Sequence, residues 1–567
     1  MKLPQLKIKK TFLLNIGLSL ATAFLVFFFS SSTSLNQLKS AVLDFSFQFK
    51  KPLADKPNII IIEVSDADID GVGRWPWSRT WHAAMLKALK ELGVKSTYFD
   101  IIFSGAATEE EDKIFEETVK ASNNAYLPFA FQDTNYNMRE AIMPLEMFSS
   151  AAKGIGSINV YPDSDGIFRK IPLILKAGDG KYYPHMALKI ALDYNGLQIK
   201  EIKPRHLIAS GNNEILDIPL IEKNNFLITW PAKNQDVFKH YSYIDVLAKY
   251  KDYLDKKISA KEMKIFKDSI CLVTVTAIGL GDIKPVPMHP EYPGAKILAV
   301  AINNLLNKTF IHTPPLWLNI LLLFLFAIFP AFIMFGEKPL KENLIIVLTG
   351  VVFASIYLVL FRYGFYMEPS MPLLGLLSST LTIGTYNFIR ISREKQNFFK
   401  MAVTDGLTGL YNIRYFRMLI ETEIMLSQPD ISKKFAIVMS DVDHFKHFND
   451  TYGHQVGDAV LKAIADSLKS TVRSSDVVAR YGGEEMIILL RGATDKDAMR
   501  VAEKLRKNIE EMTIKEEKAV HKVTASFGVS IYRQGDTTNS LIKRADDALY
   551  KSKKAGRNRI SSEENLA

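Results

Sequence analysis

The sequence predicts a multi-domain membrane protein with an α/β extracytoplasmic domain, four transmembrane helices and a C-terminal α+β domain of the ferredoxin-like, palm type. Three observations carry this prediction. Four uncharged apolar segments interrupt a chain of 567 residues, which is long enough for several domains. Strand and helix patterns alternate between the first and second apolar segments, and a separate α/β pattern follows the fourth.

The four apolar segments are residues 12–31, 314–335, 344–361 and 369–389. Each is about as long as a helix that crosses the hydrocarbon core of a bilayer. A cleavable signal peptide is the alternative for the first, because small polar residues follow it. Its apolar run is longer than a typical signal core, which favours an uncleaved anchor. The other three lie too close together in sequence to be buried helices of a soluble domain.

The basic residues set the predicted orientation of the spans. Four lysines lie within residues 1–11, two lie in the 336–343 loop, and basic residues follow the fourth span within residues 390–403. Both ends of the chain are therefore predicted to be cytoplasmic, and residues 32–313 to lie on the opposite side. The membrane-flanking lysines account for the net charge of +10, which does not by itself indicate a nucleic-acid partner.

The outer segment, residues 32–313, is large enough for its own hydrophobic core. Apolar strands at 58–64 and 269–275 and a helical pattern at 82–93 predict an α/β domain. Its single cysteine, Cys271, is the only one in the chain, which excludes an intramolecular disulfide.

Four short motifs occur along this segment, in the order GRWPWSR (73–79), YFDIIFS (98–104), DSDGIFRKIPLIL (163–175) and AIGLGDIKPVP (277–287). In that order they resemble the second type of CHASE sensor domain, a bacterial extracytoplasmic module placed before three transmembrane helices. The resemblance implies a multi-pass protein of the bacterial inner membrane, in contact with lipid, that senses an extracytoplasmic ligand. The residues do not specify that ligand. For RWPW, a packed aromatic corner is favoured over a ligand cage.

No Pro- or Gly-rich linker follows the fourth span, so a helical stalk over residues 390–403 is predicted to lead into a domain at 404–560. The order of patterns there is β-α-β-β-α-β-α, which favours a ferredoxin-like sheet with helices on its faces. The predicted elements are a strand at 434–440, a hairpin around Gly482, a helix at 496–511, a strand at 523–532 and a helix at 540–554.

The predicted hairpin places two carboxylates, Glu484 and Glu485, beside two glycines at its tip. A charged turn is the simpler interpretation, because Gly-Gly between apolar strands is a common hairpin pattern. Asp441 favours a functional site over a simple charged turn, because it ends an apolar strand, where a carboxylate is held rigidly. Asp441 and Glu484 could then share a magnesium ion, which prefers oxygen ligands and sits between carboxylates and phosphates.

Three neighbouring positions complete this hypothesis. The backbone carbonyl of Val442 is a third potential metal ligand. Glu485 either orients or deprotonates a hydroxyl group, or fixes the turn. Gly482 and Gly483 allow the backbone to approach a phosphate closely.

Five motifs of the C-terminal domain occur in one order: DGLTGLYN, DVDHFKHFND, GHQVGD, RYGGEEM and ADDALYKSKKAGRNR. They resemble the GGDEF family of diguanylate cyclases, which join two GTP molecules into cyclic di-GMP. The resemblance implies a GTP substrate, Mg²⁺ or Mn²⁺ with two ions per active half-site, and a homodimer. It implies cyclic di-GMP as product and inhibitor, and no nucleic-acid partner.

The resemblance also assigns substrate contacts. The residues that match Asn449 and Asp458 hold guanine, whose two adjacent N–H donors suit a carboxylate acceptor; adenine lacks this pair. The remaining substrate-binding residues implied by the family are Phe445, Lys446, His454, Gly482, Gly483, Lys553 and Arg557, with the cations opposing phosphate charge. For Lys553 alone, a solvated helix face is the alternative.

The sequence RSSD matches the family's inhibitory RxxD site, because five residues separate Asp476 from Gly482. There, Arg473 is expected to contact guanine and phosphate of a product dimer, and Asp476 to accept from guanine. Alone, such a pattern is usually a surface salt bridge. A supporting arginine of the family is replaced by Lys504, which cannot make the same planar fork.

Three other positions depart from the family pattern: Met486 replaces a phenylalanine, His444 an aromatic residue and Ile413 an arginine. None removes an expected metal, base or phosphate contact. The sequence therefore predicts a membrane-bound sensor diguanylate cyclase with product inhibition. A catalytically silent receptor for cyclic di-GMP is the competing hypothesis, and a membrane anchor for another signalling protein is a weaker one.

Overall fold

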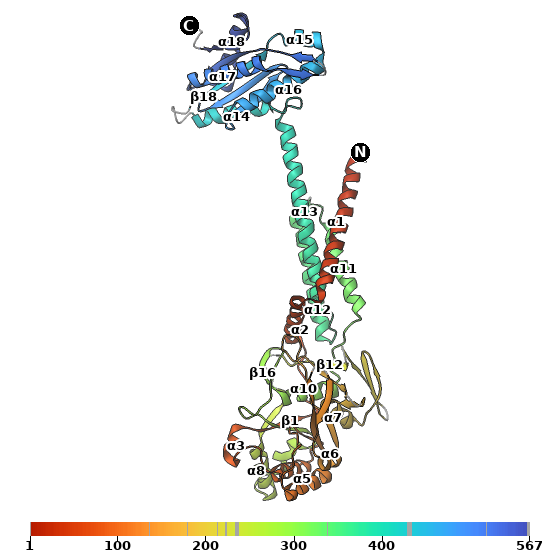
Figure 1. The fold of residues 1–567 in the computed structure, drawn as a ribbon. Helices are drawn as coiled ribbons and strands as arrows, with labels where there is room; N and C mark the ends of the chain where they lie inside the picture. The colour runs from red at the N-terminus through yellow and green to blue at the C-terminus, as the bar shows by residue number, and fades with distance from the viewer. Residues whose placement is uncertain are drawn as a thin grey trace. The chain divides into compact units, whose positions relative to one another are not determined.

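The computed structural model describes residues 2–134, 137–177, 180–211, 214–221, 224–232, 237–336, 338–427, 434–516 and 519–563. The chain divides into two compact units, Met1–Asn387 and Phe388–Ala567 (Figure 1). Each unit is described separately below.

Three helical segments of the first unit are long and apolar enough to cross a membrane. They are Lys10–Ser31, which includes most of α1 (Lys2–Phe28), together with α11 (Leu316–Ile333) and α12 (Pro339–Arg362). The fourth predicted span, 369–389, is helical and forms the first part of α13 (Ser370–Val403), but its serine, threonine and asparagine residues make it less apolar. Three of the four predicted spans thus meet the length and composition of a membrane helix, and the fourth stays a prediction.

Polar side chains connect α1 and α13 to the segment that follows α11. Asn15 Nδ2 of α1 donates to the Met334 carbonyl at 2.9 Å, and Asn387 Nδ2 of α13 donates to the same oxygen at 3.0 Å. The hydroxyl groups of Ser19 and Ser379 lie 2.9 Å apart in a buried contact between α1 and α13. These contacts give Ser379 Oγ and Asn387 Nδ2 of α13 partners inside the helix bundle, whereas Asn387 Oδ1 has none among the described residues.

A three-layer α/β domain follows α1. Its seven-stranded sheet has the order β13-β1-β14-β2-β3-β4, with β5 also paired to β3. All its pairings are parallel except that of β3 with β4. The strands are β1 (Ile59–Val64), β2 (Ser96–Phe99), β3 (Ala125–Thr134), β4 (Asn137–Ile142), β5 (Gly154–Ser157), β13 (Lys239–Ser242) and β14 (Ile270–Val275).

Both faces of this sheet are covered, which explains why its strands read as continuous apolar runs. Ile59 and Ile61 of β1 enter one core with α7 (Met186–Asn195) and α10 (Gly294–Leu306). Ile60 and Ile62 enter the other core, against α4 (Arg79–Glu91), α5 (Glu109–Ser122) and α8 (Tyr243–Leu254). The predicted α/β class is therefore correct for this domain.

Smaller elements surround the main sheet. A three-stranded sheet has the order β11-β10-β9, and two-stranded pairs form between β6 and β12, β7 and β8, and β15 and β16. Their bounds are β6 (Lys170–Pro172), β7 (Ile174–Lys176), β8 (Tyr182–Pro184), β9 (Gln198–Lys203), β10 (His206–Ser210), β11 (Ile215–Pro219), β12 (Asn225–Leu227), β15 (Ile283–Val286) and β16 (His289–Pro293); short helices are α3 (Asp66–Val72), α6 (Glu146–Ala151) and α9 (Ala260–Met263).

The RWPW segment forms a packed aromatic corner. The Trp75 and Trp77 rings lie 5.4 Å apart, centroid to centroid, and Trp77 also meets Tyr243 of α8 at 5.3 Å. Trp77 is 7% exposed, and its indole N–H donates to the Gly73 carbonyl at 2.9 Å. The contacts are those of a core, as the sequence predicted.

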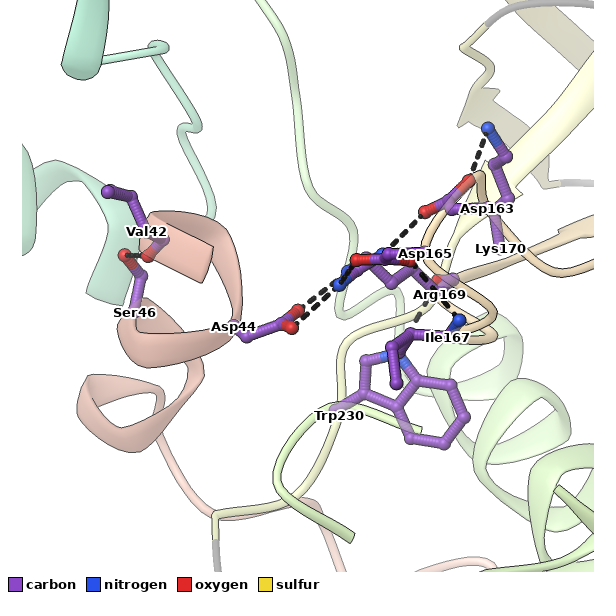
Figure 2. A network of polar contacts seen from close by, with 9 residues as sticks. All are labelled: Val42, Asp44, Ser46, Asp163, Asp165, Ile167, Arg169, Lys170 and Trp230. Atoms are coloured by element: carbon purple, nitrogen blue, oxygen red, sulfur yellow. Dashed lines mark hydrogen bonds and ion pairs between the residues drawn. The ribbon is translucent and has the colours of Figure 1, made fainter. Parts of the chain in front are cut away.

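One buried arginine joins the α/β domain to α2 (Thr33–Ser46), the helix that follows the first predicted span. Arg169 is 2% exposed, and its Nε and Nη2 donate to the two oxygens of Asp44 on α2, both at 2.7 Å. It also donates to Asp163 and Asp165 of the DSDG turn, at 2.7 to 3.0 Å. Figure 2 shows the guanidinium lying between the three carboxylates. Through Arg169, the motif DSDGIFRK thus anchors α2 to the α/β domain.

The second unit has a six-stranded sheet of order β17-β19-β20-β18-β23-β24. Its four central strands follow the ferredoxin-like topology that the sequence predicted, since β18 lies between β20 and β23 and pairs antiparallel with both. The strands are β17 (Tyr411–Asn412), β18 (Phe435–Val442), β19 (Val477–Gly482), β20 (Glu485–Arg491), β23 (Ala525–Ile531) and β24 (Ile560–Ser562), with a small pair β21 (Ile514–Glu516) and β22 (Ala519–His521).

Alternate residues of β18 enter two cores on opposite faces. Ala436 and Val438 pack with α16 (His454–Thr471) and α17 (Asp495–Glu511). Ile437 and Met439 pack with α14 (Ile413–Ser427) and α18 (Thr538–Lys554). A short helix, α15 (Phe445–Tyr452), follows β18 directly. This arrangement holds the carboxyl end of β18 beside the β19–β20 hairpin.

Candidate active site

The β19–β20 hairpin carries the two glutamates that the sequence placed at a turn. Gly483 has a φ of 51°, a left-handed conformation that favours glycine. Glu485 begins β20 and pairs in register with Gly482 of β19 on one side and with Asp441 of β18 on the other. The hairpin therefore places Glu485 directly opposite Asp441.

Asp441 is 8% exposed at the end of β18, and Lys553 of α18 neutralises it with an Nζ to Oδ2 distance of 2.7 Å. Burial, and then the charge of Asp441, raise the pKa of Glu485 above its ordinary value. Glu484, at the turn, and Val442, the last residue of β18, adjoin this pair along the chain. The site thus concentrates negative charge that one lysine only partly offsets.

The carboxylates suit a hard divalent cation, which prefers oxygen ligands. Within the described residues, no group of three or more His, Cys, Asp and Glu side chains converges on one point. Two carboxylates and a backbone carbonyl would therefore need oxygens from a substrate to complete a shell, as Mg²⁺ sites with phosphates do. Burial raises the pKa of Glu485 first, and the charge of Asp441 adds to it; a cation between the two carboxylates would offset that repulsion.

Arg480 is a functional candidate that the sequence did not single out. Its Nε and Nη2 donate to the Gly483 carbonyl at 2.9 and 2.7 Å, and its Nη1 donates to Asp405 Oδ1 at 3.1 Å. Asp405 belongs to the DGLTGLYN motif, and it accepts from the Thr408 N–H and hydroxyl at 2.9 and 2.7 Å. One guanidinium therefore fixes the hairpin tip to the segment that leads into the domain.

Asp443 is the second residue missed by sequence reasoning. It is 8% exposed and accepts from Thr524 Oγ1 at 2.8 Å, Ser526 Oγ at 2.6 Å and the Asn558 N–H at 3.0 Å. These bonds hold the loop after α18, which contains Arg557 in a left-handed conformation with a φ of 64°. Its place in the motif DVD was the only sequence feature that could have identified it.

The predicted guanine contacts lie on α15 and α16. Gly457 allows α16 to approach α15, because a Cβ at this position would lie 1.8 Å from Asn449 Oδ1. In the described part of the chain that oxygen is buried without a hydrogen-bond donor. Asp458, one residue after Gly457, is exposed. The structure therefore brings Asn449 and the start of α16 together.

The residues predicted to contact phosphate lie farther apart in the fold than the predicted guanine contacts. Lys446 and Phe445 occupy the first turn of α15, where the preceding residue, His444, provides no side-chain cap, and Lys446 is exposed. His454, at the start of α16, and Arg557, after α18, are also exposed. Lys553 is the exception, since its ammonium group contacts Asp441 rather than facing solvent alone. Uncapped N–H groups at the start of a helix suit an anion such as phosphate.

The predicted inhibitory residues lie at the other end of β19. Both oxygens of Asp476 accept backbone N–H groups, from Arg473 at 3.0 Å and Arg491 at 3.1 Å, while Arg473 is exposed. The pKa of Asp497, at the start of α17, is lowered first by hydrogen bonds from Thr494, and the charge of Arg473 adds to this effect. Lys504 is exposed on α17, about two turns beyond Asp497.

Comparisons with known proteins agree with these two units. Residues 20–332 match the sequence model of the CHASE2 domain, and residues 402–559 match that of the "Diguanylate cyclase, GGDEF domain". Diguanylate cyclase A of Treponema denticola is 40% identical over 178 residues, which are 31% of this chain and 48% of that protein. Diguanylate cyclase VdcA of Vibrio cholerae is 38% identical over 187 residues, 32% of this chain and 54% of that protein.

The chain thus spans about half the length of the curated relatives it matches. A solved structure of the coiled coil and GGDEF domain of DgcB from Caulobacter crescentus, in complex with c-di-GMP, is 28% identical and covers 33% of this chain and 98% of that chain, with a TM-score of 0.31. Since the CHASE2 match extends over more than half of the residues, the chain belongs to the CHASE2 family, and it carries a C-terminal GGDEF domain.

Proposed function

We propose that the chain is a membrane-bound sensor diguanylate cyclase, which condenses two GTP molecules into cyclic di-GMP and two pyrophosphates. The observation that carries this proposal is the pairing of Asp441 with Glu485 beside the Gly482–Gly483 turn, within a region that matches the GGDEF family. A silent receptor has no need for this concentration of carboxylates. Burial of Asp441 and the raised pKa of Glu485 are costs that a catalytic metal site explains.

Asp441, Glu484 and the Val442 carbonyl would hold Mg²⁺ or Mn²⁺, two ions per half-site. When bound, the ions supply positive charge that stabilises the triphosphate and the leaving pyrophosphate. Lys553, which contacts Asp441 at 2.7 Å, would turn to the phosphates once a cation takes its place. Glu485, with its raised pKa, is placed to hold or accept the proton of a 3′-hydroxyl.

The remaining contacts would orient GTP. Asn449 Oδ1, which is buried and has no hydrogen-bond partner among the described residues, and the Asp458 carboxylate would accept from guanine N–H groups. The first turn of α15, with Phe445 and Lys446, together with Gly482 and Gly483, would approach the phosphates through backbone N–H groups. His454 and Arg557 would border the same nucleotide.

One domain binds one GTP, so the reaction requires two facing half-sites. Each 3′-hydroxyl attacks the α-phosphate of the other GTP; a phosphodiester bond forms and pyrophosphate leaves with the electron pair of the broken bond. A two-fold homodimer provides this arrangement. Cyclic di-GMP would then inhibit through Arg473 and Asp476, with Lys504 as a weaker supporting cation.

The fragment 388–567 provides the test, because these residues form a compact unit with their own cores. With GTP and Mg²⁺ it should produce cyclic di-GMP and pyrophosphate in a 1:2 ratio, and its specific activity should rise with protein concentration. Chromatography resolves the products. A fragment that binds cyclic di-GMP but produces none would favour the receptor function instead.

The proposal includes a fourth membrane span, the first part of α13. The contact of Ser19 with Ser379 and the bond of Asn387 Nδ2 to the Met334 carbonyl give these polar groups of α13 partners within the bundle, which lowers the cost of placing them in a bilayer. With four spans in the bacterial inner membrane, the α/β domain would lie on the extracytoplasmic side and the GGDEF domain in the cytoplasm.

Thiol labelling tests this topology against a low background. Cys271 is 0% exposed and burial raises its pKa to about 12, so the native thiol should not react with maleimides. Exposed Lys113 and Lys469 are suitable positions for single cysteines. An impermeant maleimide should label Lys113→Cys in intact spheroplasts and Lys469→Cys only after lysis. Labelling of both on the same side would exclude four spans.

A further inference from the structure

Three basic residues lie where two segments of the chain meet, at the extracytoplasmic end of the third predicted span. Lys50 and Lys51 follow α2 by a few residues, and Arg362 is the last residue of α12. The Arg362 Nη1 donates to the Phe49 carbonyl at 3.2 Å, which holds the guanidinium next to the backbone of Lys50. We name the cluster of Lys50, Lys51 and Arg362 the basic junction.

Lys50 is buried in this junction against aromatic rings. It is 9% exposed, its Nζ lies 5.3 Å from the centroid of the Phe361 ring, and a Cβ at Gly364 would lie 3.7 Å from the same atom. Lys51 Nζ lies 4.6 Å from the centroid of the Tyr363 ring. Burial, and then the charge of Lys51, lower the pKa of Lys50 to about 8. A buried ammonium group without an anion destabilises the fold, because aromatic faces replace only part of its hydration.

The carboxylates nearest to the junction in sequence have other partners. The two oxygens of Asp44 accept from Arg169, both at 2.7 Å (Figure 2). Glu368 accepts the Ser370 N–H at 2.9 Å, at the start of α13. In the described part of the chain, no carboxylate pairs with a cation of the basic junction. The junction therefore carries a charge of about +3 at pH 7 and lacks an anion.

The surroundings of the basic junction are those of a bilayer surface. The large side chains beside it are between 38% and 64% exposed, namely Phe45, Phe49, Tyr363 and Phe365. The Phe45 and Phe49 rings lie 5.4 Å apart. Exposed aromatic rings next to basic residues at the end of a span lie at the level of the lipid headgroups. The missing anion is therefore expected at headgroup depth.

One face of α12 leads directly to the junction. Val352, Ile356 and Val359 are about half exposed, and their spacing of three or four residues places them on one side of the helix. Arg362 and Tyr363 continue the same spacing at the end of the helix. An acyl chain that lies along this apolar face would thus have its headgroup at the basic junction.

We infer that the basic junction binds the phosphate of an anionic phospholipid in the extracytoplasmic leaflet. The inference rests on the proposed membrane topology, which places the end of α12 at that leaflet. The phosphate oxygens accept from the Arg362 guanidinium and from the Lys50 and Lys51 ammonium groups. A zwitterionic phospholipid fits less well, because its headgroup brings a cation to a site that already has an excess of positive charge.

Lipid competition on the full chain in detergent tests the site. Native mass spectrometry with phosphatidylglycerol and phosphatidylcholine in equal amounts should show a preference for phosphatidylglycerol of about tenfold or more. Phosphatidylglycerol should also raise the melting temperature of the full chain, because a ligand that binds only the folded state stabilises it. Inorganic phosphate at the same concentration should leave the melting temperature unchanged, since it has no acyl chain to lie along α12.

Methionine variants separate this site from general attraction to an anionic surface. Lys50→Met and Arg362→Met should each lower the preference for phosphatidylglycerol by about fivefold or more. Lys341→Met is the matched control, because Lys341 is exposed in the first turn of the same helix, at its other end. In phosphatidylcholine alone, Lys50→Met should melt no lower than the parent chain, since methionine removes a buried charge. A purely structural role for Lys50 predicts a lower melting temperature in both lipids.

Equal binding of the two lipids by the parent chain overturns the inference, and this measurement does not depend on any variant. So does an equal rise in melting temperature with inorganic phosphate, an unchanged preference in both Lys50→Met and Arg362→Met, or an equal loss of preference in Lys341→Met. Thiol labelling of Lys113→Cys and Lys469→Cys decides the topology separately. A failure of the four-span proposal and a failure of the lipid site are therefore distinguishable.

Discussion

Replacement of Arg480 by methionine tests whether one guanidinium holds the tip of the β19–β20 hairpin. In the structure, Arg480 donates twice to the Gly483 carbonyl, at 2.9 and 2.7 Å, and once to Asp405 Oδ1 at 3.1 Å. Methionine keeps the aliphatic part of the side chain and removes these hydrogen bonds, together with the longer one from Nη1 to Asp405 Oδ2 at 3.4 Å. The variant therefore separates the polar contacts from the packing.

The expected loss of stability follows from the exposure of the pair. Hydrogen bonds from a charged donor contribute about 1.5–3 kcal/mol each when buried, and exposed ion pairs about 0–1 kcal/mol. The Arg480 and Asp405 side chains are 19% and 23% exposed, between these limits. We expect the free energy of unfolding of fragment 388–567 to fall by about 2 kcal/mol at pH 7, measured by urea unfolding.

The difference should depend on pH. Burial raises the pKa of Asp405, but hydrogen bonds from Thr408 and the charge of Arg480 outweigh it and lower the pKa. A carboxylate with a lowered folded pKa stabilises the fold above its unfolded pKa of about 3.9, and this contribution is lost as the pH falls through the folded value. The stability difference between the parent fragment and Arg480→Met should therefore shrink below about pH 4.

Catalysis distinguishes a clamp at the tip from general stabilisation. Arg491, at the opposite end of β20, pairs with Glu423 at 2.8 Å, so Arg491→Met is a matched control. The initial rate of GTP turnover per folded molecule should fall by about tenfold or more in Arg480→Met, because the tip glutamates lose their positions, and should change little in Arg491→Met. A loss of stability below about 0.5 kcal/mol, or equal rates in both variants, would refute the reasoning.

Three further predictions concern nucleotide and product. Glu484→Gln removes a charged metal ligand and should lower pyrophosphate release by orders of magnitude while cyclic di-GMP still binds by calorimetry; loss of both would mean misfolding or a shared site. Asp458→Asn should reduce the preference for GTP over ATP in competing-substrate assays, and an unchanged preference would remove Asp458 from the guanine site. Lys504→Arg restores a planar fork, so it should strengthen product inhibition; coincident inhibition curves would place Lys504 outside the inhibitory site.

The central strands could be predicted from the sequence because each is buried on both faces. All eight residues of β18 are buried, and the apolar run that results ends at Asp441, which made this carboxylate identifiable. The edge strand β17 could not be predicted, since it has two residues and depends on pairing with β19, far along the chain. The strand forms because of this long-range pairing, and its own two residues carry no strand pattern.

The same limit explains the two missed residues. Arg480 acts through Asp405, 75 residues away, and Asp443 acts through Ser526 and Asn558, 83 and 115 residues away. Neither contact leaves a periodic pattern in the local sequence. Residues whose role is to hold another segment in place become visible only when the fold brings that segment to them.

The length of β19 also limits how the proposed product inhibition would operate. A strand rises about 3.3 Å per residue, so the six residues from Val477 to Gly482 separate Asp476 from the hairpin tip by about 20 Å. Cyclic di-GMP bound at Arg473 and Asp476 therefore cannot occupy the GTP site of the same domain. The proposed inhibition would then act by preventing two half-sites from facing each other.

This separation predicts non-competitive inhibition. Added cyclic di-GMP should lower the maximal rate of GTP turnover by fragment 388–567 without raising the GTP concentration needed for half-maximal rate. Arg473→Ala should keep the maximal rate at all product concentrations, because its side chain is exposed and lies at the far end of β19 from the glutamates. Initial rates over a matrix of GTP and cyclic di-GMP concentrations measure both effects. Inhibition that excess GTP reverses would instead locate the bound product in the catalytic site, against the separation that β19 imposes.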